Sequence, residues 1–191
     1  MTPQSLVGPQ LRSLADALDG CEPDRPSLCE GWQVRHVVAH LTMAARYDEA
    51  AFGAELAAVG YDFGALSETV ARRDAELPWA SLLDDLRSEV LAGFAMPGGG
   101  AASSLTHAVI HGLDITVAAG MRRTSDDTAV RLVLDALVVD PSPFGIHLDG
   151  LRLRATDVDW KHGSGTEVAA PAEELVLALA NRPRGLPLGA G

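Results

Sequence analysis

Apolar residues recur at spacings of three to five over most of residues 4–138, and this helical period restricts the chain to a mainly helical fold. The first apolar face consists of four leucines, namely Leu6, Leu11, Leu14 and Leu18. We expect this first helix to end at Gly20, because glycine tolerates the backbone conformation that closes a helix. A second apolar stripe predicts one long helix from Trp32 to about Ala58.

A third helical region follows the breaks at Gly60 and Gly64. Its apolar period is interrupted or restarted at Pro78 and continues to Phe94. The segment at residues 97–100, a proline followed by three glycines, cannot continue a helix, so it must end this region.

Two more helices are expected before the pattern changes. One spans about residues 103–119 and is closed by Gly120. A shorter one spans residues 125–138, with Ser125 as its N-cap and two aspartates in its first turn, where the helix dipole favours negative charge.

The hydrophobic period then changes to two, which is typical of a strand with one buried face. This alternation covers residues 151–156, and the segments 158–161 and 166–169 could pair with it across a turn at 162–165. A last helix is expected over residues 171–181. We therefore predict two parts, a helical bundle at residues 1–140 and a small C-terminal α/β unit at residues 141–191.

The charge and the apolar runs exclude several classes of partner. The net charge is −11, and the acidic residues are spread along helical faces, so a nucleic-acid backbone would be repelled. No run of about 18 apolar residues is present to cross a bilayer. The first residues lack the basic and apolar segments of an export signal, so we expect a cytoplasmic protein. A homodimer is compatible with the sequence but not required by it.

The two cysteines, Cys21 and Cys29, are expected to be reduced thiols. Two cysteines cannot build the dense disulfide framework of small secreted domains. Their spacing matches no common zinc motif, so we interpret them as structural or incidental residues rather than as metal ligands.

Three histidines are the candidate metal ligands. His107 and His111 stand four residues apart in a predicted helix, so their side chains lie on one face about one turn apart. His40 lies in the apolar stripe of the second predicted helix and should point inward. A lone inward histidine is more often a hydrogen-bonded core residue, but three unpaired imidazoles are costly to bury and favour a shared divalent cation.

The other polar residues near these histidines have less specific interpretations. Asp114 follows His111 by three residues and could orient its ring as an outer-shell group, or could equally be a solvated helix residue. His36 is expected at the exposed rim or at a pocket edge. His147 and His162 fall in loop-rich sequence and are expected at the surface.

Three segments resemble the mycothiol-dependent maleylpyruvate isomerase family of the DinB/YfiT-like superfamily. They are CEGWQVRHVVAHL, LTHAVIHGLDITVAAG and LRLRATDVDWKHGSGTEVAAPAEELVLALANRP, and the resemblance extends over nearly the whole chain. It places the family's tryptophan and histidine motif on Trp32 and His40 and its metal pair on His107 and His111. It implies an up-down-down-up four-helix bundle with a metal between helices at one end. At His107, isomerase members tend to carry glutamate.

The resemblance implies chemistry on a thiol. A divalent metal, zinc or nickel, would stabilise the thiolate of mycothiol, which would add to a small electrophile and catalyse isomerisation or transfer. Polar contacts to the thiol would come from residues near His40, with four candidates: Arg35, His36, Arg46 and Tyr47. The alternative is a non-catalytic, metal- or ligand-binding DinB-like protein.

Overall fold

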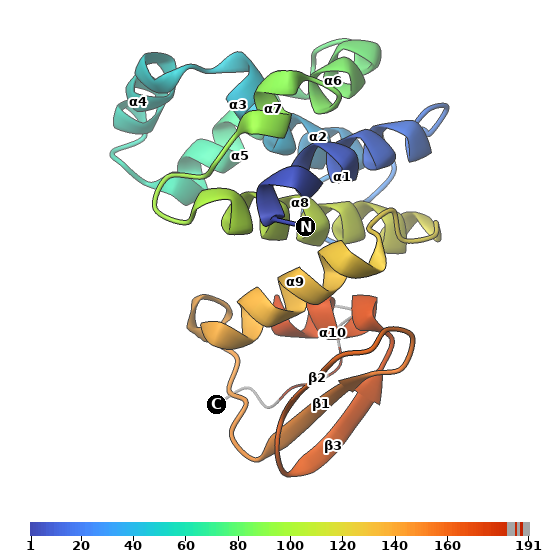
Figure 1. Ribbon diagram of the computed structural model, residues 1–191. Coiled ribbons are helices and arrows are strands. Elements are labelled where there is room, and N and C mark those ends of the chain that lie inside the picture. The colour runs from blue at the N-terminus through green and yellow to red at the C-terminus, as the bar shows by residue number, and fades with distance from the viewer. Residues whose placement is uncertain (183–185, 187, 189–191) are drawn as a thin grey trace.

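The computed structural model describes residues 1–182, 186 and 188, and within them helices dominate the chain (Figure 1). The helices are α1 (Pro3–Ala17), α2 (Val34–Leu41), α3 (Met43–Arg46), α4 (Glu49–Ala58), α5 (Phe63–Asp74), α6 (Trp79–Leu86), α7 (Glu89–Gly93), α8 (Gly100–Ala119), α9 (Asp127–Val139) and α10 (Ala172–Leu179). A short 3-10 turn (Ser142–Phe144) precedes the strands β1 (Leu151–Ala155), β2 (Lys161–Gly163) and β3 (Thr166–Ala170). The rest of the predicted C-terminal unit, at 183–185, 187 and 189–191, lies outside the described residues.

The first helix agrees with its prediction. Thr2 caps α1 in a reciprocal capping box with Ser5, and the helix closes through Leu18 into Gly20, whose φ is +77°. The four leucines of its apolar face are all buried in the core.

The single long helix predicted over residues 32–58 is wrong, because the chain breaks twice within it. The Thr42 hydroxyl donates to the carbonyl of Val38 and ends α2, so this polar side chain competes for helical backbone partners. Tyr47 is extended, and the Asp48 carboxylate accepts from the Ala51 amide to start α4 as a new helix. Apolar periodicity continues through both breaks, which is why it did not reveal them.

The later helices follow the prediction with local differences. The break at Gly60 and the restart at Pro78 are confirmed, but Gly64 lies inside α5. Ser88 caps a further short helix, so the region that ends near Phe94 is divided once more. The N-cap of α9 is Asp126 rather than Ser125, because its carboxylate reaches the amide three residues ahead.

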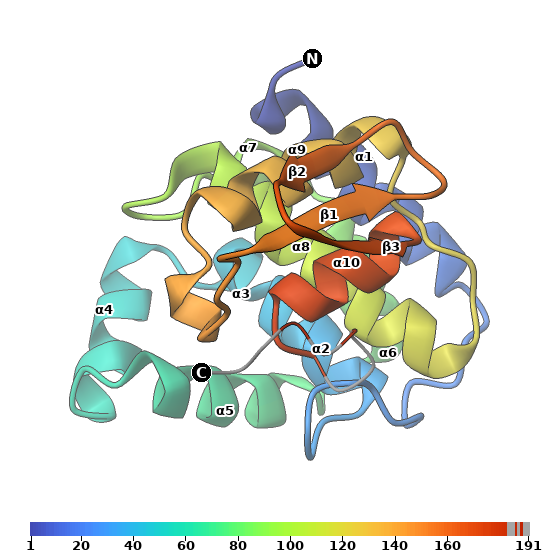
Figure 2. The ribbon, with the colours of Figure 1, turned by 90° about the horizontal axis from the view of Figure 1, so that it is seen from below.

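The strands form a three-stranded sheet in the order β2-β1-β3, in which β1 is antiparallel to β2 and parallel to β3. The predicted alternation of β1 is confirmed, since Leu153 and Ala155 are buried and Arg152 is exposed. The strand expected at 158–161 lies at Lys161–Gly163 instead. The sheet and α10 lie together below α9 and α8 in Figure 1, and in front of α8 when the molecule is seen from below (Figure 2).

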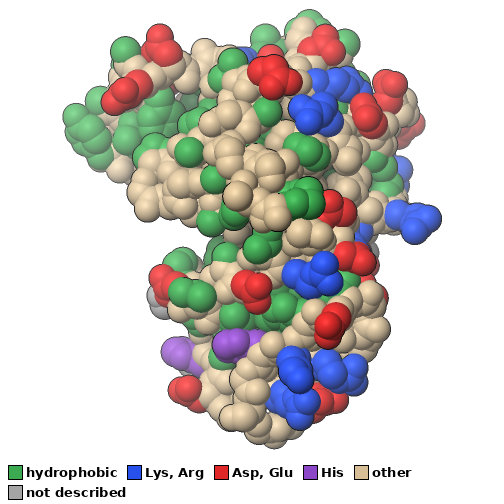
Figure 3. Space-filling view, in the orientation of Figure 1, with side chains coloured by type: hydrophobic (Ala, Val, Ile, Leu, Met, Phe, Trp, Pro, Cys, Tyr) green, Lys and Arg blue, Asp and Glu red, His purple; other side chains and the backbone are tan. Residues whose placement is uncertain are grey.

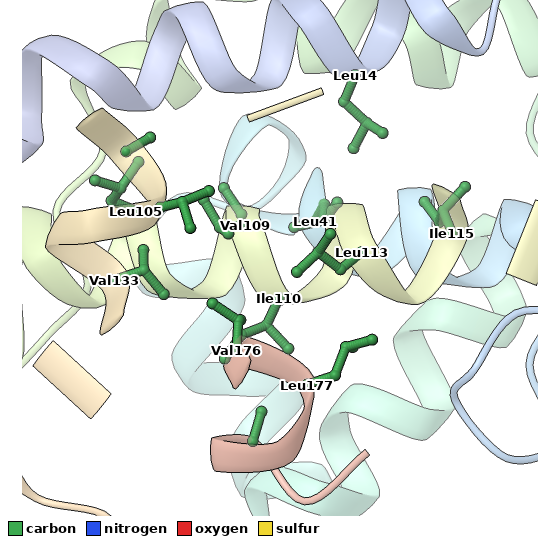
Figure 4. Close-up of a cluster of buried hydrophobic side chains, with 14 of the residues drawn as sticks. Leu14, Leu41, Leu105, Val109, Ile110, Leu113, Ile115, Val133, Val176 and Leu177 are labelled. Atoms are coloured by element: carbon green, nitrogen blue, oxygen red, sulfur yellow. The ribbon is translucent and has the colours of Figure 1, made fainter. Parts of the chain in front are cut away.

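The helix α8 forms the centre of the molecule and packs against α1, α2, α9 and α10. Its two sides bury different partners: Leu113 lies towards Leu14 of α1, and Ile110 towards Val176 of α10 (Figure 4). Buried side chains from the bundle and from β1 and α10 belong to one hydrophobic cluster. The predicted boundary at residue 140 therefore crosses a continuous core and stays a prediction. None of the described helices is long and apolar enough to cross a membrane.

Candidate metal centre

The structure brings His40, His107 and His111 together where α2 packs against α8. The Nε2 atoms of His40 and His107 are 2.8 Å apart, and the ring centroids of His107 and His111 are 4.6 Å apart. The His40 ring is 5.0 Å from that of His111, so each ring contacts the other two. Each of the three offers one nitrogen, and these three nitrogens lie within 4.8 Å of one another.

The electrostatics of this cluster keep the imidazoles of His40 and His107 neutral. Burial, reinforced by His111 and Arg182, lowers the pKa of His40 to about 3. Burial and the neighbouring imidazoles of His111 and His40 hold the pKa of His107 well below its usual range. Neutral rings at neutral pH retain the nitrogen lone pairs that a metal requires.

The hydrogen bonds within the cluster leave capacity for a cation. His40 buries its Nδ1 atom without a hydrogen-bond partner among the described residues. Its Nε2 atom faces the Nε2 atom of His107, and two unprotonated nitrogens at that distance repel one another unless a proton or a cation lies between them. The donor set is three imidazoles, which suits zinc or nickel, so the residues present fit the metal implied by the resemblance.

Asp114 is fully buried beside this cluster, which excludes the solvated alternative. Its Oδ2 atom lies 2.9 Å from His111 Nδ1, so the His111 ring turns its Nε2 atom away from this carboxylate. Burial alone would raise the pKa of Asp114, but the hydrogen bond with His111 and the charge of Arg182 outweigh it and lower that pKa. The carboxylate thus remains charged and can hold the His111 tautomer.

Sequence reasoning missed two further partners of this carboxylate. Arg182, just after α10, places its Nε atom 2.9 Å from Asp114 Oδ1, and Cys29 donates its thiol to Asp114 Oδ2 at 3.1 Å. Cys29 also lies 3.8 Å from His111 Nδ1, so Cys29, His111 and Asp114 form a second group with metal-ligating atoms close together. Neither contact has a local sequence signal, because each joins segments more than 60 residues apart.

The second group fits a cation less well than the three histidines. Burial, followed by the charge of Asp114, raises the pKa of Cys29 to about 12, so its thiol stays protonated. The Asp114 carboxylate is already occupied by His111, Arg182 and this thiol. Of the two interpretations of Cys29, structural or incidental, its contacts favour the structural one, because it contributes to the hydrogen-bond network behind His111.

The remaining predicted residues lie away from the histidine cluster. His36 accepts from the Gln33 amide at the start of α2 and lines neither cavity described below. His147 is exposed, and His162 is half-buried against Trp160. Arg35 pairs with Asp24.

Of the candidate thiol contacts, only Tyr47 lines a cavity that reaches the histidines. Its hydroxyl is already bound to Asp74. Arg46 is engaged with the carboxylates of Asp74 and Asp85.

Two cavities open on the histidine cluster and share His107 and Met96. One has a volume of about 340 Å³, reaches His40 and is walled largely by apolar side chains from α3, α4 and α7. The other has a volume of about 410 Å³, reaches His111 and includes Arg182. The cluster is thus reached by one cavity at His40 and by the other at His111, and both cavities include His107.

A helical bundle with a C-terminal α/β unit, and with three clustered histidines that two cavities reach, defines the class: a mainly helical protein with a candidate metal centre. Residues 6–93 match the family model of the mycothiol maleylpyruvate isomerase N-terminal domain. The matched part is just under half of the chain and includes His40 but not α8.

Two solved structures share the fold. A crystal structure of the mycothiol-dependent maleylpyruvate isomerase is 13% identical with a TM-score of 0.55, and the match covers 95% of this chain and 88% of that one. A histidine-to-alanine mutant of such an isomerase is 15% identical with a TM-score of 0.54, covering 96% and 87%. The predicted mainly helical, DinB-like fold is confirmed. No curated protein sequence matches this chain.

Proposed function

We propose that this protein is a metal- and thiol-dependent isomerase or transferase that acts on a small electrophile. The observation that carries the proposal is the convergence of three imidazoles, with ligand atoms within 4.8 Å of one another, at a point that two cavities reach. One cavity would admit the thiol and the other its electrophilic partner. The family model that residues 6–93 match and the solved structures of similar fold are both named for mycothiol, which suggests mycothiol as the thiol.

In this proposal, His40, His107 and His111 hold a divalent metal. When bound, such a cation favours the ionised form of a neighbouring thiol and so supplies a nucleophile at neutral pH. Asp114 keeps the Nδ1 side of His111 occupied, which presents the Nε2 atom to the centre. Three protein ligands leave a further position open, as in catalytic rather than structural sites.

The thiol has to come from outside the protein. Cys29 is the cysteine beside the histidines, but its pKa is raised to about 12 and its thiol donates a hydrogen bond to Asp114. The thiol therefore stays protonated and is a poor nucleophile. The other cysteine, Cys21, lies near the end of α1 and lines neither cavity. A low-molecular-weight thiol therefore fits the site better than a protein nucleophile.

The reaction begins when the thiol loses its proton to solvent and its sulfur adds to one carbon of a conjugated double bond. A carbon–sulfur bond forms, and the π electrons move to the conjugated carbonyl oxygen. Rotation about the new single bond and expulsion of the sulfur restore the double bond with the opposite geometry, so the thiol is regenerated. If a proton instead adds to the neighbouring carbon, the conjugate is the product and the reaction is a transfer.

The direct test is calorimetry of metal-loaded protein against mycothiol, repeated with metal-free protein and with a desthiol analogue. We expect tight binding only when both the metal and the thiol are present, and weaker binding towards acid pH because the thiol must ionise and the imidazoles must be neutral. Equal affinity in all three titrations would exclude an interaction between the metal and the thiol.

The alternative is a non-catalytic, metal- or ligand-binding protein, and the histidine at position 107 favours it, since the resemblance implies glutamate there in isomerases. Thermal unfolding with and without a chelator separates the two functions. An exchangeable catalytic ion should change the melting temperature little, whereas a structural ion should stabilise the fold strongly.

A further inference from the structure

The two cavities that meet at His107 differ in the charges on their walls. The cavity that reaches His40 has apolar walls that include Met43, Phe52, Leu91 and Phe94, and no described residue lining it is Arg or Lys. The other cavity is lined by one basic and one acidic residue, Arg182 and Asp140. Resting on the proposed function, we infer that the apolar cavity takes an uncharged, apolar electrophile and excludes carboxylates.

The mouth of this cavity carries negative charge. Asp48 and Glu49, at the start of α4, line it and are exposed. In the space-filling view, hydrophobic side chains gather with acidic ones over α4 (Figure 3). An anionic substrate would approach two carboxylates on a protein whose net charge is already −11, so its entry is opposed both locally and by the whole molecule.

Apart from the two histidines at the inner end, the uncharged polar side chains that line the cavity are already engaged in hydrogen bonds. The hydroxyl of Tyr47 donates to Asp74. The Ser104 hydroxyl donates to the Gly100 carbonyl and accepts from the Met96 amide. A carboxylate buried among the apolar walls, away from the candidate metal centre at the inner end, would lack a cationic partner, and an unpaired buried charge is strongly unfavourable.

The dimensions and the depth of the cavity suit an aromatic or branched molecule. Its volume of about 340 Å³ is at the lower end of the range for small-molecule sites. His40 and His107 lie at its inner end, so an electrophile seated on the apolar walls would present its reactive carbon to the candidate metal centre. Burial of its apolar surface would supply the affinity of the electrophile, and the position of the histidines would determine which end of the electrophile reacts.

The test compares two unreactive ligands on metal-free protein, benzylacetone and its para-carboxylate, by calorimetry. We expect the neutral ketone to bind at least about tenfold more tightly, because the carboxylate would be buried without a partner. Equal binding, or tighter binding of the carboxylate, would overturn the inference. The measurement needs neither metal nor thiol. The preference for the neutral ligand can therefore be contradicted while the proposed function stands, and the proposed function can be contradicted while this preference stands.

Two variants locate the binding. Ala44→Phe should reduce the affinity for benzylacetone by about tenfold or more because Ala44 lines the cavity, whereas the exposed Ala50→Phe adds the same group elsewhere on the surface. Unchanged affinity in a folded Ala44→Phe protein would show that the ketone binds elsewhere and would overturn the inference.

A charge reversal at the mouth tests the same point on an exposed residue that should not affect folding. Glu49→Arg should narrow the preference for the neutral ligand severalfold, while Glu22→Arg, an exposed position outside both cavities, should not. If the two reversals changed the ligand preference equally, the charge at the mouth would not control entry of the carboxylate ligand, and this part of the inference would be overturned.

Discussion

At the scale of single residues, the buried carboxylate of Asp114 joins the candidate metal centre to the rest of the protein. It receives hydrogen bonds from His111, Cys29 and Arg182, which come from three separate parts of the chain. Of these contacts, the sequence indicates only the one with His111, through its spacing of three residues. Cys29 and Arg182 approach through tertiary packing, so no local pattern could have placed them.

The role of Asp114 predicts the effect of Asp114→Asn. Loss of the charge should leave His111 free to change tautomer and should weaken metal binding about 10- to 100-fold, the usual effect of removing an outer-shell partner. Competition with a chromogenic chelator measures the affinity, and circular dichroism checks the fold. Asp24→Asn, which removes only an exposed partner of Arg35, is the control. Equal affinities for both variants would show that Asp114 does not orient a ligand.

The lowered pKa of His40 predicts how acid affects the metal-free protein. Burial lowers this pKa from 6.5 to about 3, so between these values the unfolded chain binds a proton that the folded chain rejects. The contribution of His40 to the free energy of unfolding is therefore fully present above about pH 6.5, and it is lost as the pH decreases towards 3. Urea midpoints across this window should decrease, and the decrease should be shallower in His40→Leu. If the urea midpoint depended on pH equally in the two proteins, the lowered pKa of His40 would be contradicted.

At the scale of secondary-structure elements, the break between α2 and α4 determines the shape of the apolar cavity. Arg46 lies between these two helices, at the end of α3, and donates hydrogen bonds to Asp74, Asp85 and the carbonyl of Ala39. The sequence predicts most helices because their apolar faces repeat, and it predicts α1 and α8 nearly to their ends because Gly20 and Gly120 close them. It misses the break at Thr42 and the new helix starts at Asp48 and Ser88, where polar side chains form hydrogen bonds with the backbone.

The Arg46 network predicts a large difference between two arginine variants. Arg46→Met should destabilise the protein by about 3 kcal/mol, because it leaves the buried Asp74 with fewer cationic partners. Arg72→Met removes an exposed helical ion pair with Glu68 and should cost less than about 1 kcal/mol. Urea denaturation of both variants measures the difference. A loss below about 1 kcal/mol for Arg46→Met would mean that this network does not hold the break.

At the scale of the whole molecule, we propose two parts, residues 1–140 and 141–191, that unfold together. One hydrophobic cluster contains Leu14 and Leu113 of the bundle together with Leu153 and Leu175 of the C-terminal unit, and Arg182 reaches back to Asp114. Native-state hydrogen exchange should show the amides of Leu113 and Leu153 opening in the same global event. Opening of the β1 amides at a much lower denaturant concentration would show that the C-terminal unit is independent.

The account as a whole depends on a metal held by His40, His107 and His111. Elemental analysis of purified protein tests this most directly, with single alanine variants of each histidine and with His36→Ala and His162→Ala as controls. We predict about one divalent ion per chain in the unaltered protein and in both controls, and loss of most of it in each of the three variants, with all proteins folded by circular dichroism. Unchanged metal content in all three variants would contradict the account.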